Sequence, residues 1–180
     1  MSKKESKEKL FLTKGEKLRI LSFVKEIVNI PSVECIYLLP IMHYNGQSQI
    51  IIKVILSANP TYNEKMYGKK YYSWIENEKN VYLTIENKYN STNDRILFSQ
   101  AHPIIECSDY DFDWYSMFEL ANSTILFDRF KNITRIKKES LLNNNIVDMM
   151  DNKYFAVIDE PKKLLNLIKK IDCSPNYYLN

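Results

Sequence analysis

Three aspartates at alternate positions form a possible site for a divalent cation in this 180-residue chain. Asp109, Asp111 and Asp113 lie in the segment Ser108-Asp-Tyr-Asp-Phe-Asp-Trp114. On an extended strand alternate side chains point to one face, and carboxylate oxygens are ligands that Mg²⁺ and Ca²⁺ prefer. The segment also suits an exposed acidic loop in which Asp111 or Asp113 caps a following helix. We favour the loop, because the glycine and the closing glutamate of an EF-hand are missing.

Glu106 precedes these aspartates, so an alternative metal-binding set is Glu106, Asp109 and Asp111. The cysteines and histidines offer no such set, because they are widely separated and form no CxxC, HExxH or H-x-E pattern. They are Cys35, Cys107, Cys173, His43 and His102. No segment resembles the Gly-x-Ser-x-Gly turn of a serine nucleophile. We therefore expect no bound cofactor and assign no catalytic residue.

The composition is that of a soluble globular protein, with 45% hydrophobic and 26% charged residues. Its three glycines argue against a glycine-rich phosphate-binding loop. No apolar run reaches the length of a membrane span, and the charged N-terminus lacks the apolar segment of a signal peptide. Because the cysteines also form no disulfide framework, these features predict a cytoplasmic protein without a membrane partner.

Positive charge is concentrated near the N-terminus. The first 25 residues contain eight Lys or Arg and three Glu, whereas no Lys or Arg lies between Arg95 and Arg129. We interpret residues 1–12 as a flexible basic tail and residues 13–180 as one domain. A dedicated nucleic-acid-binding protein usually has a basic face with interleaved aromatic residues. Nucleic-acid binding through the basic N-terminus is therefore an alternative that we do not favour.

Hydrophobic spacing predicts a helix over residues 14–29, begun by a capping box in which Thr13 and Glu16 satisfy free backbone amides. Two apolar runs, 35–42 and 49–56, predict strands, and the Asn45-Gly46 turn between them predicts an antiparallel pair. Further along we expect an aromatic-faced helix at 62–75, a strand at 81–86, a polar loop at 87–93 and one or two short strands at 96–108. A helix at 112–121, a short apolar turn or strand at 123–127 and two helices at 131–151 and 161–171 follow. This order predicts a single compact α+β domain with a small mixed sheet, flanking helices and a C-terminal helical layer.

Three segments carry a resemblance to a known family, and they are Val33-Glu-Cys-Ile-Tyr-Leu38, Ser48-Gln-Ile-Ile-Ile-Lys-Val54 and Leu126-Phe-Asp-Arg129. They resemble the first strand, the second strand and the terminal Leu-Tyr-Asp element of the nucleotidyltransferase superfamily. This superfamily includes DNA polymerase beta and the aminoglycoside nucleotidyltransferases. The resemblance implies a first strand that ends in Gly-Ser for the nucleotide phosphates and a second that begins with Asp-x-Asp for two Mg²⁺ ions.

The chain departs from this pattern at the residues that carry the chemistry. Leu39-Pro40 or the apolar residues nearby stand where Gly-Ser is expected, and Gln49 and Ile51 stand where the two aspartates are expected. Glu106, on the segment Ile104-Ile105-Glu106, could supply the third carboxylate of the family, but one carboxylate cannot hold two metal ions. The sequence therefore predicts a degenerate member of the superfamily without transferase activity.

The favoured hypothesis is a catalytically silent protein that binds another protein and regulates or inhibits it. Its candidate interface combines aromatic and acidic residues, which are Tyr67, Tyr71, Trp74, Asp109, Asp111 and Asp113. The aromatic residues are equally compatible with the core side of an ordinary helix. The abundance of Asn, Lys, Ile and Tyr suits an AT-rich bacterial phage or mobile element, and the acidic residues suit the basic groove of a host nucleic-acid enzyme. A divergent Mg²⁺-dependent nucleotidyltransferase is the alternative.

Overall fold

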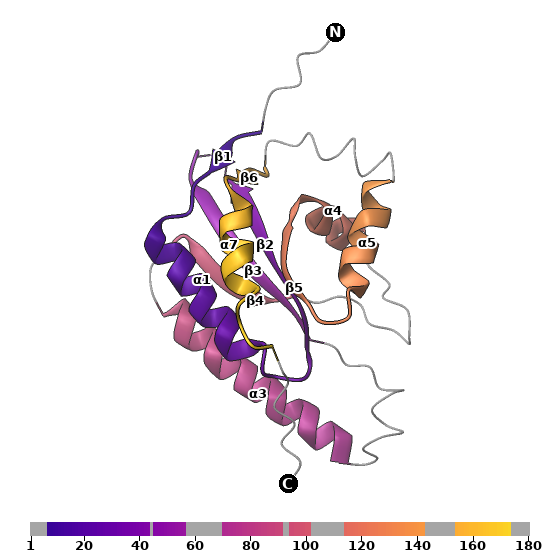
Figure 1. The fold of residues 1–180 in the computed structure, drawn as a ribbon. Coiled ribbons are helices and arrows are strands. Elements are labelled where there is room, and N and C mark those ends of the chain that lie inside the picture. The colour runs from indigo at the N-terminus through magenta and orange to yellow at the C-terminus, as the bar shows by residue number, and fades with distance from the viewer. Residues whose placement is uncertain are drawn as a thin grey trace.

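The computed structural model describes residues 7–43, 45–56, 70–91, 94–101, 114–142 and 154–173, with the backbone alone for 70–76 and 114–117. These residues form a four-stranded mixed sheet with helices on both faces, together with a separate pair of short strands (Figure 1). The predicted α+β class, the single compact domain and the small mixed sheet are therefore confirmed.

Strands β2 (Val33–Met42) and β3 (Ser48–Leu56) form the antiparallel hairpin that the sequence predicts. In the connecting turn Gly46 adopts a φ of 77°, a conformation that glycine reaches without a Cβ clash. Every residue of β2 from Val33 to Pro40 is buried. Strand β2 therefore needs a packing layer on each of its faces.

The outer strands extend the sheet to the order β4-β3-β2-β5. Strand β4 (Ile96–Gln100) is parallel to β3, and helix α3 (Lys70–Asn90) belongs to the crossover that a parallel connection requires. Strand β5 (Thr124–Asp128) is antiparallel to β2. Beyond β5, the same edge of β2 is covered by a bridge from Ile41 to Phe155. Both edges of β2 are thus paired.

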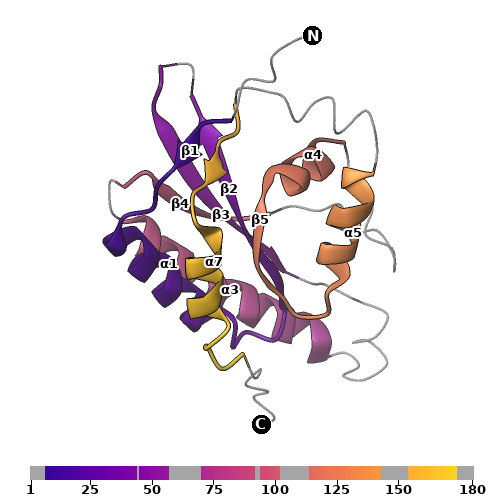
Figure 2. The same cartoon turned by 45° about the horizontal axis from the view of Figure 1, so that its top comes forward.

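Helices α1 (Lys14–Ile27), α3 and α7 (Pro161–Ile168) cover one face of the sheet, as Figure 2 shows. Their buried side chains form the main core together with the inward residues of the strands. Large, almost completely buried members of this core are Ile20, Phe23, Ile27, Ile36, Leu38, Ile50, Ile52, Tyr82 and Phe98. Burial of one such aliphatic or phenylalanine side chain contributes roughly 1.5–3 kcal/mol, so this layer is a major source of stability.

Helices α4 (Trp114–Asn122) and α5 (Asn132–Leu141) lie on the opposite face (Figure 1). The buried residues of this layer are Cys35, Tyr37, Leu39, Ile55, Ala101, Phe118, Leu120, Ile133 and Phe155. Residues of β2 therefore alternate between two cores, which explains why its sequence is a continuous apolar run. None of the described helices has the length and the apolar character that crossing a membrane requires.

A two-stranded sheet joins the N-terminal segment to the C-terminal part of the chain. Strand β1 (Lys9–Leu10) pairs in parallel with β6 (Val157–Ile158). Leu10 and Leu12 are buried in the main core. The packed structure therefore begins before residue 13, within the segment that we interpret as a basic tail.

The predicted strand at 81–86 is wrong, because α3 continues through these residues to Asn90. The predicted polar loop at 87–93 is wrong for its first four residues for the same reason. The alternating segment also fits a helix whose inner side carries Glu78, Tyr82 and Tyr89. Tyr82 is completely buried in the main core. Tertiary packing therefore decides between the two-residue repeat of a strand and the 3.6-residue repeat of a helix. The other predicted helices and strands within the described residues are present with shifted ends.

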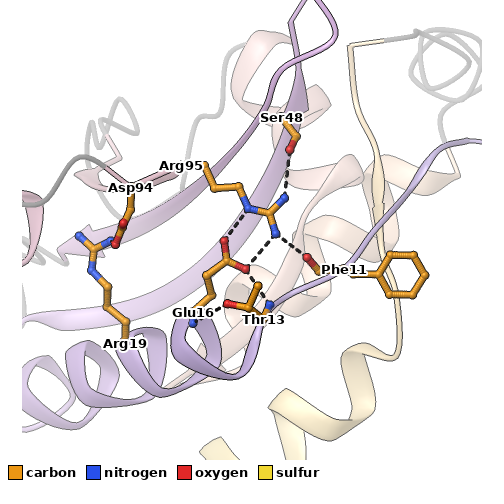
Figure 3. A network of polar contacts seen from close by, with 7 residues as sticks. All are labelled: Phe11, Thr13, Glu16, Arg19, Ser48, Asp94 and Arg95. Carbon is orange, nitrogen blue, oxygen red and sulfur yellow. Dashed lines mark hydrogen bonds and ion pairs between the residues drawn. The ribbon is translucent and has the colours of Figure 1, made fainter.

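A charged network joins the start of α1 to the sheet (Figure 3). Thr13 and Glu16 form the predicted capping box, in which each side chain accepts a hydrogen bond from the backbone amide of the other residue. The Arg95 guanidinium donates to both oxygens of the Glu16 carboxylate, at 2.5 and 2.8 Å. It also donates to the Ser48 hydroxyl and to the Phe11 carbonyl. Arg95 therefore ties the beginnings of α1, β3 and β4 together.

The side chain of Asn90 closes the outer edge of β4 at Phe98. Its amide nitrogen donates to the Phe98 carbonyl at 2.7 Å, and its amide oxygen accepts from the Phe98 backbone amide at 2.9 Å. A further strand would use these two backbone groups to pair with β4. The last residue of α3 thus satisfies a backbone position at the edge of the sheet.

The hydrogen bonds from Arg95 lower the pKa of the Glu16 carboxyl below its ordinary value of 4.5. Such a carboxylate stabilises the fold above its unfolded-state pKa, and the stabilisation is lost as the pH falls through the lowered folded-state pKa. We expect Glu16→Gln to lower the free energy of unfolding at neutral pH by about 2 kcal/mol. We expect the difference from the wild type to shrink between about pH 5 and pH 3, as measured by urea unfolding at a series of pH values.

Glu139→Gln is the matched control, because the Glu139 carboxylate forms an exposed pair with Arg135 one helical turn away. Such pairs contribute at most about 0.5 kcal/mol. A deficit of Glu16→Gln that stays constant across the whole pH series would contradict the role assigned to the ionised carboxylate.

Candidate functional site

Three of the residues at the predicted active-site positions, Leu39, Gln49 and Ile51, are neighbours on one face of the sheet. Gln49 and Ile51 lie near the start of β3, opposite Ile41 and Leu39 of β2. Ile51 is also paired with Leu97 of β4. Because alternate residues of a strand share a face, these side chains lie on the face that α4 and α5 cover. The sheet register thus brings together the positions that the resemblance assigns to phosphate and metal binding.

These positions carry no carboxylate. On the same face β4 contributes Leu97 and Ser99, and the strand has no acidic residue along its length. Glu106, the predicted third carboxylate, lies outside the described residues. The described strand that pairs with β3 on this side is β4. Among the described residues, the strand positions beside Ile51 therefore offer one neutral side-chain amide, that of Gln49, and no carboxylate of the kind that Mg²⁺ requires. Among the described residues, no three His, Cys, Asp or Glu side chains gather where they could hold a metal ion.

An internal ion pair lies further along the same face. Lys53 of β3 donates to a carboxylate oxygen of Glu119 of α4 at 2.5 Å. The two side chains are 19% and 5% exposed, so the pair is largely removed from water. The Glu119 carboxylate is already neutralised by the Lys53 ammonium group. It is therefore not a free ligand for a divalent cation at this face.

Apolar packing fills the adjoining part of the face. The rings of Phe118 and Phe155 meet edge to face, with centroids 5.1 Å apart. Leu39 is completely buried in the same cluster, and Ile51 packs against it with partial exposure. Leu97 keeps 38% of its surface exposed, so the face is more accessible at β4 than at β2.

The buried ionisable groups near α5 have structural roles. Burial raises the pKa of the Cys35 thiol well above its ordinary value, with further contributions from the charges of Asp128 and Glu34. A nucleophilic cysteine needs a lowered thiol pKa, so Cys35 is not a candidate nucleophile. Burial lowers the pKa of Lys137, whose ammonium group donates to the Ser123 carbonyl.

The Leu126-Phe-Asp-Arg129 element anchors β5 to its surroundings. One carboxylate oxygen of Asp128 accepts from the backbone amide and from the hydroxyl of Thr134 in α5, both at 2.7 Å. The Arg129 guanidinium donates to four backbone carbonyls, two of which follow the end of α1, where a cation is favourable. These carbonyls belong to Val28, Ile30, Val33 and Cys173.

The predicted interface and the alternative metal set fall on parts of the chain without described side chains. Tyr67, Glu106, Asp109, Asp111 and Asp113 lie outside the described residues. Tyr71 and Trp74 lie in α3, where the backbone alone is described. An interface formed by these residues therefore stays a prediction.

The Lys53–Glu119 pair is not among the sequence predictions, although one signal for it exists. Lys53 interrupts the apolar run 49–56, and a charged residue in a buried strand needs a partner. The identity of that partner cannot be read from the sequence, because Glu119 lies 66 residues further along in a separate helix.

No protein-family model matches the chain, and comparisons with curated proteins and with solved structures find no match. Membership of the nucleotidyltransferase superfamily therefore stays a prediction that rests on three short segments. The described geometry defines an α+β domain in which the face bearing Gln49 and Ile51 carries a neutral amide, aliphatic side chains and an internal ion pair.

We expect Lys53→Met to lower the free energy of unfolding by about 3 kcal/mol, because it leaves the Glu119 carboxylate buried without its partner. The double variant Lys53→Met/Glu119→Leu replaces the pair with apolar side chains of similar size. We expect the double variant to be more stable than Lys53→Met alone. Urea unfolding followed by circular dichroism measures both differences.

Arg135→Met serves as the control, because it removes an exposed ion pair that contributes less than about 1 kcal/mol. If the double variant were less stable than Lys53→Met, Glu119 could not be the carboxylate that the single substitution leaves without a partner.

Proposed function

We propose that this protein is a catalytically silent nucleotidyltransferase-like protein that binds another protein and regulates or inhibits it. The observation that carries the proposal is the register of Ile51 beside Leu97, with Gln49 two residues away on the same face. Nucleotidyl transfer needs two divalent ions held by carboxylates at such a place. A protein that keeps such a fold but lacks the metal-binding carboxylates still has a folded surface. The activity that this surface can perform is the binding of another protein.

The end of β2 is equally unsuited to phosphate binding, which supports the same proposal. Leu39 and Pro40 stand where a Gly-Ser pair is expected, and proline has no backbone N–H to donate to a phosphate. The Pro40 carbonyl accepts from the Ala156 amide at 3.3 Å, and the Met42 amide donates to the Tyr154 carbonyl at 2.7 Å. The backbone at this end of β2 is thus engaged in pairing with a neighbouring segment.

The expected partner is a protein with a basic groove, such as a nucleic-acid enzyme of a host cell. The acidic group Asp109, Asp111 and Asp113 supplies complementary charge, and Tyr and Trp side chains are frequent anchors of protein interfaces. A small inhibitor of this kind suits a phage or mobile element.

The second candidate function is that of a divergent Mg²⁺-dependent nucleotidyltransferase that uses Glu106, Asp109 and Asp111. It is kept because the segment that contains these carboxylates connects β4 with α4, and both elements contribute to the face that bears Ile51.

A nucleotide assay separates the two candidates. We expect the purified protein to show neither transfer nor binding of any labelled nucleoside triphosphate in the presence of Mg²⁺, because the strand positions beside Ile51 carry no carboxylate and the Glu119 carboxylate is paired with Lys53. The triple variant Glu106→Ala/Asp109→Ala/Asp111→Ala should then be indistinguishable from the wild type. Turnover in the wild type that disappears in this variant would replace our proposal with the second candidate.

A recovery experiment tests the proposed partner. Tagged protein isolated from its native host should carry a protein in stoichiometric amount, and Asp109→Asn/Asp111→Asn/Asp113→Asn should lose that protein without a change in melting temperature. Glu139→Gln, which removes an exposed carboxylate of α5, should retain it. Isolation of the protein with a bound nucleotide in place of a protein partner would contradict the proposal.

A further inference from the structure

The charged residues of α1 are sorted onto two sides of the helix. Its glutamates, Glu16 and Glu26, lie on the side of β4 and α3. The Glu16 carboxylate accepts from Arg95 at 2.5 Å. The Glu26 carboxylate accepts from Lys88 and from Tyr89 of α3, and both of these distances are 2.7 Å. Both carboxylates are therefore neutralised by partners inside the domain.

The lysines of α1 lie on the side of α7. Lys14, Lys17 and Lys25 recur after three and eight residues, which places them on one stripe of the helix. The two helices are in contact and lie side by side in Figures 1 and 2. The pKa of Glu160, the residue before α7, is lowered chiefly by Lys163 and to a smaller extent by Lys17. Lys17 therefore lies within electrostatic reach of Glu160 at the beginning of α7.

The outer side of α7 is strongly basic. Leu164 and Ile168 are buried in the main core and fix the inner side of the helix. The segment 161–171 contains four lysines and no acidic residue. The exposed residues of this segment are Lys162, Lys163, Asn166, Leu167, Lys169 and Lys170.

Seven lysines therefore share one surface, the α1–α7 lysine surface, which consists of Lys14, Lys17, Lys25, Lys162, Lys163, Lys169 and Lys170. Six of them are exposed and Lys17 is half-buried. The acidic neighbours among the described residues are Glu160, which is bonded to Lys163 at 2.5 Å, Asp159, which forms an ion pair with Lys9 at 3.9 Å, and Asp172 beyond the helix. The surplus of positive charge here exceeds the net charge of +3 of the whole chain, so positive charge is concentrated at this surface.

We propose that the α1–α7 lysine surface binds the phosphate backbone of a nucleic acid without reading its sequence. Nucleic acids carry closely spaced phosphates, and lysine contacts to phosphates position a protein without selecting a base. An ammonium group is a compact point charge that suits this contact. The seven side chains that define the surface are all lysines, and Phe11, three residues before Lys14, is an exposed aromatic residue close to them in the sequence. Because the proposed contacts are with phosphate charge, we expect binding that does not discriminate between bases.

A membrane fits this surface less well than a nucleic acid does. A helix that lies on a membrane inserts an apolar side between the lipids, whereas the apolar sides of α1 and α7 are buried in the main core. Leu18 and Leu167 are exposed, but one side chain from each helix does not make an apolar face. The proposal does not depend on the proposed function, because it concerns a different face of the domain from the one that bears Ile51.

Fluorescence anisotropy with a labelled mixed-sequence DNA duplex tests the proposal on the full chain. We expect the logarithm of the affinity to fall linearly with the logarithm of the salt concentration. Lys169→Gln/Lys170→Gln should weaken binding to all sequences equally and make the slope shallower by about two. The matched control is Lys79→Gln/Lys138→Gln, which removes the same charge from exposed positions of α3 and α5 and should leave the slope unchanged.

Circular dichroism melting of both variants verifies that they fold like the wild type. An equal loss of affinity in both double variants, or no binding at low salt, would overturn the proposal. Binding to phosphatidylserine vesicles but not to the duplex would overturn it in favour of a membrane. Binding that disappears when residues 1–6 are deleted, and that Lys169→Gln/Lys170→Gln does not change, would assign it to the N-terminal segment instead.

Discussion

Strand β2 has to be covered on both faces, and this requirement governs where the other elements lie. Its residues from Val33 to Pro40 are buried, with α1, α3 and α7 on one face and α4 and α5 on the other. On the second face, Phe118 and Phe155 pack around Leu39 and cover it. Packing thus uses the face on which a pair of metal ions would need charged ligands and room for a nucleotide.

The parts of the fold that could be predicted depend on local signals. The start of α1 follows from the capping box at Thr13, and the β2–β3 hairpin follows from two apolar runs around an Asn-Gly turn. Helix α3 could not be predicted over 81–90, because a segment with apolar residues at alternate positions can also satisfy a helical period. The burial of Tyr82 against strands that are distant in the sequence decides the outcome, and single-sequence patterns do not contain that information.

The candidate site was predictable to the same extent. The sequence alone shows that Gln49 and Ile51 are unsuitable ligands for a divalent cation, because neither side chain is charged. The predicted hairpin also fixes the positions of both residues. Leu97 could not be identified as their neighbour, because its position depends on a parallel pairing across a long crossover. The α1–α7 lysine surface also could not be predicted from the sequence. Charges counted along the chain mix Lys14 and Lys17 with Glu16, whereas the folded helix directs them to different sides.

The hydrogen bonds of Asn90 restrict how other molecules can approach this domain. An exposed sheet edge invites an incoming extended peptide, or a second copy of the same protein, to continue the sheet. At β4 the middle of a five-residue edge is already occupied by a side chain that mimics the missing neighbour. Recruitment by strand addition is therefore obstructed at β4, and recognition there has to rely on exposed side chains such as Leu97. The binding specificity of this edge therefore depends on side chains, so a single substitution there can change it without changing the sheet.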